Sequence, residues 1–155
     1  MVNAQQISFS DLMQAARCND KNCFNALALQ KKYFFFTVQT DIYSDTYVYT
    51  NNKDLNSKTA IDFSISFFKP PINSEIATSA ALRHYLKDYF LVILKQAAEE
   101  NYIADKTVKD PAAYFGMITY KSKKYPNYFL NVTVRKDERG LTQYFMEVQS
   151  PGKGN

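Results

Sequence analysis

The sequence predicts a single α+β domain in which one antiparallel β-sheet carries two helices packed on one face. Two patterns predict it: apolar residues recur at helical spacing in two segments, and most of the remaining chain alternates apolar and polar residues. The chain has 155 residues, of which 46% are hydrophobic and 22% charged, with four glycines and five prolines. This composition is typical of one compact domain over residues 1–155 and excludes disordered and fibrous proteins.

The first helical segment is expected at residues 8–32, with a break in the middle. Ser8 can cap the helix, and Asp11 lies in its first turn. The four residues between Cys18 and Cys23 are poor helix formers, so the helix should break there. Two cysteines five residues apart cannot bridge along an unbroken helix, whereas a turn brings them into range. We therefore expect a Cys18–Cys23 disulfide, and two reduced thiols are the alternative.

Three strands are then expected, at residues 33–38, 46–50 and 59–69. In the third, the apolar residues from Ile61 to Phe67 alternate with polar residues that include Ser64 and Ser66. This alternation predicts a sheet with one dry face and one wet face. Pro70 and the proline after it should end the strand.

A second helix is expected at residues 80–100, where one stripe of apolar residues consists of Leu82, Tyr85, Leu86, Tyr89, Phe90, Ile93 and Ala97. His84 lies on the polar side of this helix, with Asp88 at i+4, and we expect the two to form a solvent-exposed pair. Leu91 lies opposite the stripe and should be exposed.

Three more strands are expected at residues 114–121, 128–136 and 142–149, followed by a flexible tail at 150–155. Each half of the chain then has a helix followed by three or four strands, with the halves at about 8–74 and 75–149. This order predicts an internal duplication, and a single meander with two unrelated helices is the alternative.

Charge and hydropathy narrow the classes of partner. The net charge of +4 is weaker than the basic stripe of most nucleic-acid-binding modules, so no nucleic acid is expected. The longest apolar run, Tyr89–Leu94, is too short to span a membrane. The residues from Asn3 to Gln6 are typical of a signal-peptide cleavage site. We therefore expect a secreted or periplasmic protein whose signal peptide has been removed.

The residues that usually carry catalysis are few. The chain has one histidine and lacks the Gly-x-Ser-x-Gly and P-loop motifs, so we expect no enzyme, no cofactor and no metal site. Asp62 and Glu147 could share the wet face of the sheet. Together with His84 they are the basis of a hydrolytic alternative.

One segment resembles the RNP1 motif of RNA-recognition motifs. Residues 113–120 match its pattern at Phe115, Gly116 and Tyr120, and three lysines follow within four residues. No basic residue opens the segment, and a chain that begins with a helix differs from the strand-first order of that family. RNA binding is therefore a lesser alternative.

Aromatic residues make up 15% of the chain, with twelve tyrosines, twelve phenylalanines and no tryptophan. Tyrosine is enriched at protein interfaces, and its hydroxyl is costly to bury alone. The candidate residues for binding another protein are Tyr47, Tyr49, Tyr120, Tyr128, Tyr144 and Arg135. The expected function is a non-catalytic protein-binding module, with an immunity-type inhibitor that acts by occlusion as its most specific form.

The alternative outside protein binding is a carrier of a small apolar ligand. Its pocket would lie between the helices and the sheet, lined by Phe35, Phe63, Phe67, Tyr89 and Phe90.

Overall fold

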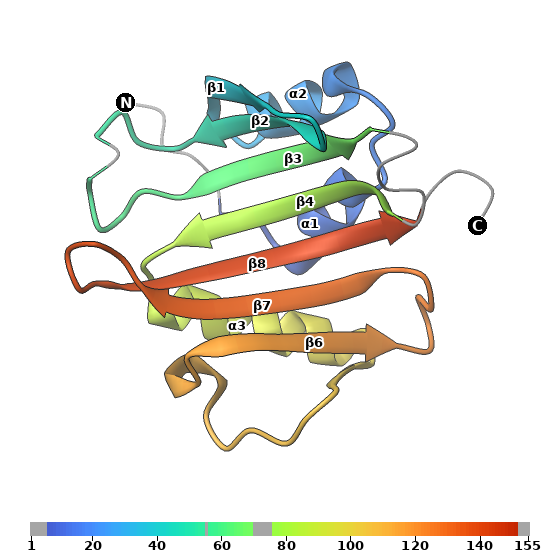
Figure 1. Ribbon diagram of the computed structural model, residues 1–155, viewed down its shortest axis with the longest axis vertical. Coiled ribbons are helices and arrows are strands. Elements are labelled where there is room, and N and C mark those ends of the chain that lie inside the picture. Colours follow the sequence, from blue (N-terminus) through green and yellow to red (C-terminus); the bar gives the residue numbers. More distant parts are fainter. Residues whose placement is uncertain (1–5, 55, 70–75, 152–155) are drawn as a thin grey trace.

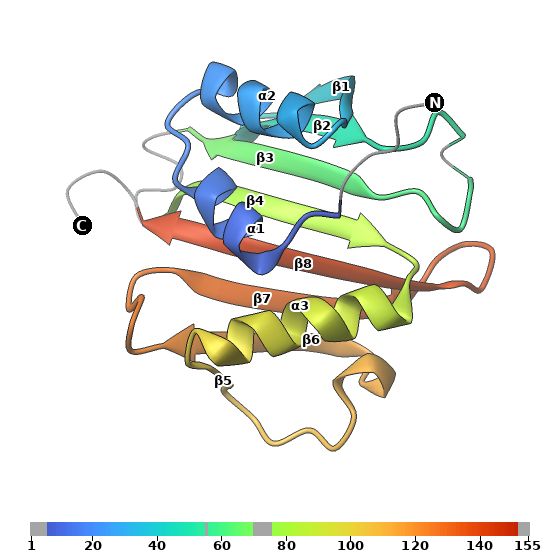
Figure 2. The same ribbon diagram turned by 180° about the vertical axis from the view of Figure 1, so that it is seen from behind.

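The computed structural model describes residues 6–54, 56–69 and 76–151. Eight antiparallel strands form one sheet in the order β1-β2-β3-β4-β8-β7-β6-β5. Figure 2 shows the three α-helices of the described residues in front of this sheet, and Figure 1 shows the opposite face bare. The predicted α+β class, the antiparallel sheet and the one-sided helical layer are therefore confirmed.

The elements in chain order are α1 (Phe9–Ala16), α2 (Lys21–Gln30), β1 (Phe34–Thr40), β2 (Ser44–Thr50), β3 (Asp62–Phe68), β4 (Ile76–His84), α3 (Lys87–Glu99), β5 (Tyr102–Ala104), the short 3₁₀ helix η1 (Pro111–Ala113), β6 (Gly116–Ser122), β7 (Phe129–Lys136) and β8 (Thr142–Pro151). Pro70, which was expected to end the third strand, lies outside the described residues. Within those residues, no helix has both the length and the hydropathy needed to cross a bilayer.

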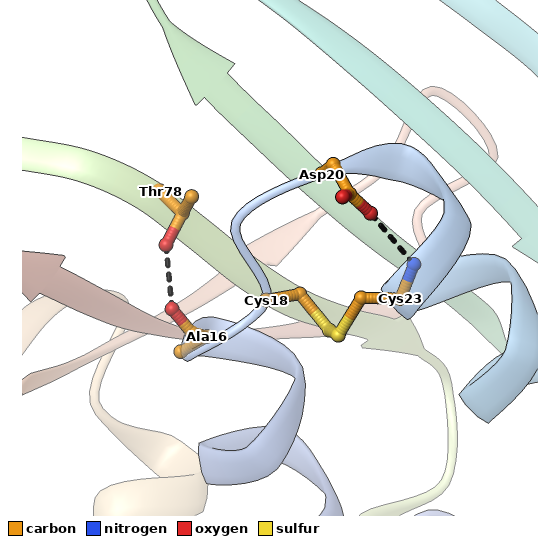
Figure 3. Close-up of a disulfide and its surroundings, with 5 residues drawn as sticks. All are labelled: Ala16, Cys18, Asp20, Cys23 and Thr78. Carbon is orange, nitrogen blue, oxygen red and sulfur yellow. Dashed lines mark hydrogen bonds between the residues drawn. A yellow bond between two sulfur atoms is a disulfide. The ribbon is translucent and has the colours of Figure 1, made fainter.

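The break in the first helical segment separates α1 from α2. The Asp11 backbone N–H donates to Ser8 Oγ over 3.1 Å, and the Ser8 N–H donates to Asp11 Oδ2 over 2.9 Å, which makes a capping box at the start of α1. Asp20 caps α2 by accepting a hydrogen bond from the Cys23 N–H over 2.9 Å. A disulfide joins Cys18 to Cys23 across the turn (Figure 3).

A buried hydrogen bond fastens the end of α1 to the sheet. The hydroxyl of Thr78 on β4 donates to the Ala16 carbonyl over 2.6 Å, close to the disulfide (Figure 3). Because the Ala16 carbonyl is at the C-terminal end of α1, this bond satisfies an acceptor that the helix itself leaves unpaired.

The second predicted helix starts too early in the sequence. Residues 80–84 belong to β4, and α3 begins only at Lys87. Leu82 and His84 face the helices and are fully buried, whereas the side chain of Arg83 between them is exposed on the other face. The strand is central, paired with β3 on one side and β8 on the other. Alanine and leucine have high helix propensity, but two flanking strands override that preference.

The two halves of the chain have a similar order of elements. Helices α1 and α2 precede the four-stranded meander β1–β4, and α3 precedes the meander β5–β8, in which η1 separates β5 from β6. The last strands of the two meanders pair at the centre of the sheet. Because β4 continues the first meander, the halves correspond best when they are divided after His84. The internal duplication itself stays a prediction. β8 extends to Pro151 and so includes the first two residues of the expected tail.

Candidate functional site

Two of the tyrosines expected at a binding surface are buried beneath the helices. Tyr49 is 1% exposed, and its hydroxyl donates to Asn25 Oδ1 on α2. Tyr144 is 4% exposed and stacks on Phe90 of α3, with 4.7 Å between ring centroids. Both side chains hold a helix against the sheet, so neither offers surface to a partner. This placement corrects the expectation for these two residues.

The other three tyrosines are half-buried on the helix-bearing side. The Lys21 ammonium of α2 lies 5.2 Å from the ring centroid of Tyr47, and the Arg17 guanidinium lies 5.3 Å from that of Tyr128. Tyr120 packs against the core, where burial raises the pKa of its hydroxyl. The five tyrosines therefore do not form one surface. Of the six candidate residues, the exposed Arg135 is the one on the bare face.

The bare side of the sheet, here called the open face, consists of the alternate residues that point away from the helices. The strand register aligns one row of side chains across seven strands: Thr37, Val48, Ser64, Ala81, Glu147, Asn131 and Thr119. Neighbouring rows contain Ser66 and Ser79, which also have small side chains.

These small side chains leave a hollow in the open face above β3 and β4. Its volume is about 230 Å³, and Ser64, Ser66 and Ala81 are among the residues that line it. Phe36 and Phe145 lie at the same hollow and are larger than the residues between them. A protruding side chain of a partner could therefore enter the hollow and contact phenylalanine rings.

The acidic residues of the open face are both engaged by neighbours. Asp62 forms an ion pair with Arg83, whose Nε donates to Asp62 Oδ2 over 3.2 Å. Glu147 accepts hydrogen bonds from Ser79 Oγ over 2.8 Å and from Gln149 Nε2 over 3.3 Å. The two acids do share this face, as the hydrolytic alternative required, but side chains of the same face already bind both oxygens of Glu147 and Oδ2 of Asp62.

Further hydrogen bonds fix the neutral polar groups of the open face. The hydroxyls of Thr46 and Ser66 lie 2.8 Å apart, and Thr119 Oγ1 donates to Asn131 Oδ1 over 2.8 Å. Thr46 and Ser66, which line the hollow, are therefore held in place before any partner binds.

The β6–β7 part of the open face is apolar and basic. Met117 is exposed there, and the Lys121 ammonium lies 5.6 Å from the ring centroid of Phe129. Arg135 Nε donates to Gln143 Oε1 over 2.8 Å, which orients its guanidinium along the face. Met117, Phe129 and the two phenylalanines at the hollow were not among the residues predicted from the sequence. The signal was present for Met117, Phe129 and Phe145, because each of them alternates in its strand with residues of the core, whereas Phe36 lies at the β-bulge of β1, a strand with no buried residue.

His84 is buried and does not pair with Asp88. Its side chain is 0% exposed and stacks on the Tyr89 ring with 4.7 Å between centroids. Nδ1 accepts a hydrogen bond from the Leu86 N–H over 3.1 Å, and Nε2 has no partner among the described residues. Burial lowers the pKa of His84 to about 4. The expected exposed pair is therefore wrong, because residue 84 ends a central strand and does not lie on a helix surface.

Among the described residues, those expected to line a carrier pocket pack against different neighbours. Phe63 packs on Phe24 of α2, with 4.7 Å between ring centroids, whereas Phe90 packs on Tyr144. Phe35 is about half exposed at the edge of the sheet. Phe63 and Phe90 therefore contact different parts of the core, and Phe35 lies outside it.

The residues behind the RNP1 resemblance are also separated. Phe115 is exposed just before β6, whereas Tyr120 packs against the core between the sheet and the helices. They do not form a common stacking platform.

Comparison of the chain with protein-family models, with curated proteins and with solved structures finds no match. A function is therefore inferred from the structure itself, and the open face with its hollow is the feature that can receive a partner.

Proposed function

We propose that the protein is a non-catalytic protein-binding module whose open face receives its partner and acts by occlusion, in the manner of an immunity-type inhibitor. The observation that supports this function is the bare sheet face with a hollow of about 230 Å³ between Phe36 and Phe145. Side-chain anchors that enter such hollows supply most of the binding energy at protein interfaces, and aromatic residues are enriched there.

The hydrogen-bonded side chains of the open face favour this function. Binding loses affinity when side chains must be ordered at the interface, at roughly 0.5–1.5 kcal/mol for each mobile side chain. Ser79, Glu147 and Gln149 already bond to one another, as do Thr46 and Ser66. A partner therefore meets a face whose polar groups are already ordered.

The charge of the open face indicates the kind of partner. Arg83 and Asp62 neutralise each other, whereas Lys121 and Arg135 form no ion pair within the described residues. Complementary charge speeds association and selects among partners. The face is suited to a protein that presents an apolar side chain next to acidic residues.

The disulfide supports an exported protein. Disulfides persist mainly in oxidising compartments, and Cys18–Cys23 closes an exposed turn between two helices. The partner should therefore be sought outside the cytoplasm.

A pair of tryptophan substitutions tests the binding face. The protein is used to capture partners from the extracellular and envelope fractions of its source, and the captured protein is purified for affinity measurement. Ser64→Trp fills the hollow and should weaken binding at least tenfold. Leu91→Trp places the same side chain on the exposed surface of α3, on the far side of the molecule, and should leave affinity unchanged.

A second test of the binding face reverses the charge of Arg135 and leaves the hollow unaltered. Arg135→Glu should slow association and weaken binding, whereas Lys95→Glu on the exposed side of α3 should not. Equal binding by the wild type, Ser64→Trp and Arg135→Glu, with all three folded by circular dichroism, would overturn the proposal. So would loss of binding in the α3 variants alone.

A further inference from the structure

β1 is an edge strand with few of the features that usually protect an edge. It ends the strand order and, among the described residues, pairs only with β2. Its sequence, FFFTVQT, contains no charged residue and no proline, which are the usual blocks to edge-to-edge pairing. The edge at the other end of the sheet, β5, has only three residues. A β-bulge between Phe35 and Thr37 is the one irregularity of β1, and Thr37–Thr40 pairs regularly with β2 beyond it.

The side chains along β1 are apolar and about half exposed. Phe35 is 47% exposed, Phe36 is 48% exposed and Val38 is 45% exposed. A strand added at this edge would lie beside these side chains and pair the outward backbone groups of β1. Because the backbone groups of a strand edge form their hydrogen bonds with another strand, the segment that binds here is itself an extended strand.

The charges at the two ends of β1 indicate which strand would pair with it. Lys32 lies two residues before the strand and is exposed, whereas Lys31 beside it already forms an ion pair with Asp11 over 3.2 Å; the exposed Asp41 comes immediately after the strand. Hydrogen bonds from the Ser44 and Tyr43 backbone N–H groups lower the pKa of Asp41, so its carboxylate is charged at neutral pH. The strand is therefore neutral along its length, basic at its start and acidic at its end.

Antiparallel pairing of two identical strands brings the start of each beside the end of the other. In a pair of β1 strands, Lys32 of one copy would lie near Asp41 of the other, and this contact would occur twice. Parallel pairing would instead place like charges together. Lys69 forms an ion pair with Asp45 at the same turn, which reduces the acidic charge there without cancelling it.

We propose that two copies of the protein pair antiparallel through β1 and form one continuous sheet. The twofold axis of such a pair is perpendicular to the sheet. The helices of both copies then lie on one side, and both open faces lie on the other. Each copy contributes the same surface, as in most symmetric dimers.

The solution mass tests the pairing directly. Sedimentation velocity of the wild type over a range of concentrations should show a species of twice the 17.9 kDa chain mass. Val38→Lys places two ammonium groups in the paired edge and should raise the dissociation constant of the dimer at least tenfold. Leu91→Lys makes the same kind of change on the exposed surface of α3 and should leave the dimer intact.

Two further measurements separate edge pairing from other modes of association. Lys32→Glu should weaken the dimer without changing the strand, and amide hydrogen exchange of residues 34–40 should slow as protein concentration rises. A wild-type monomer at all concentrations overturns the proposal. So does a dimer that is unaffected by both Val38→Lys and Lys32→Glu, or one whose concentration-dependent protection lies in β7 or in α3 and not in β1.

Discussion

Acidification should destabilise the protein through His84, well above the pH at which carboxylates titrate. The imidazole is fully buried, its Nε2 has no partner among the described residues, and burial lowers its pKa to about 4. The rings next to it belong to Tyr89 and Tyr144, which are uncharged at acidic pH. No described anion contacts the ring to stabilise a bound proton, so the folded protein holds His84 neutral.

The sign and size of the effect follow from the two protonation equilibria. The unfolded chain binds a proton at the ordinary pKa of 6.5, whereas the folded protein binds it only near 4. The contribution to stability is therefore complete above pH 6.5 and is lost as the pH falls from 6.5 toward 4. At pH 5, about 1.5 units below the ordinary pKa, the loss is about 2 kcal/mol at about 1.4 kcal/mol per unit. For a domain of this size the melting temperature should fall by roughly 4–8 °C.

Urea denaturation at pH 7.5, 6.5, 5.5 and 5.0 measures this loss, with His84→Phe as the matched variant. Phenylalanine can still stack on Tyr89 but does not titrate, so the free energy of unfolding of the variant should vary little over this range. Because the chain has a single histidine, no other histidine contributes to the wild-type curve. The reasoning is refuted if the wild type loses less than about 0.5 kcal/mol between pH 7.5 and 5, or if His84→Phe loses as much as the wild type.

Three further predictions concern stability. Tyr144→Ala should lower the free energy of unfolding by about 3–5 kcal/mol, since it leaves a cavity beside Phe90; an unchanged urea midpoint would show that Tyr144 is not a core residue. Replacing both Cys18 and Cys23 with serine should cost about 2 kcal/mol, because the closed loop is short, and adding a reductant to the wild type should reproduce that shift in a thermal melt. Ser8→Ala removes the N-cap of α1 and should lower the free energy of unfolding by about 1 kcal/mol, as measured by urea denaturation. Ser10→Ala, at an exposed position in the first turn of the same helix, should lower it much less.

Alternation along the chain was sufficient to predict most of the fold. In β3 the buried Phe63 and Ile65 alternate with Ser64 and Ser66, and this pattern alone predicts a sheet that is covered on one side. The helix caps were equally readable, because Ser8 and Asp11 have the residue types and spacing of a capping box. Local patterns of this kind need no knowledge of distant contacts.

β4 could not be recognised in the same way. Its residues Ala80, Ala81 and Leu82 favour a helix when taken alone, and the helical stripe of α3 follows directly. The strand forms because β3 and β8 lie on both sides of it, and β8 is more than 55 residues later in the chain. The same error placed His84 on a helix surface.

Tyr49 and Tyr144 were predicted at a binding surface from their residue type and not from their position in the alternation, and both are buried. Tyr144 and Phe145 are neighbours in β8, yet Tyr144 lies beneath α3 and Phe145 borders the hollow. Tyrosine is enriched at interfaces, but a strand residue faces a partner only if it is on the uncovered side. Because Glu147 was expected on the wet face, the alternation of the strand also places Phe145 on that face, although Phe145 was not among the predicted residues.

Pairing through β1 should raise the affinity of the protein for a partner that carries two copies of its binding surface. Pairing through β1 sets two open faces on the same side of one sheet, so a partner with two copies of its binding surface could occupy both. The second contact would then form within one complex, at an effective concentration of up to about millimolar, and overall affinity could exceed that of a single face by roughly 10²–10⁴. Val38→Lys should remove this gain while leaving the affinity of each face unchanged, whereas Ser64→Trp should weaken each face and leave the dimer intact. The two variants thus separate how strongly one face binds from how many faces act together.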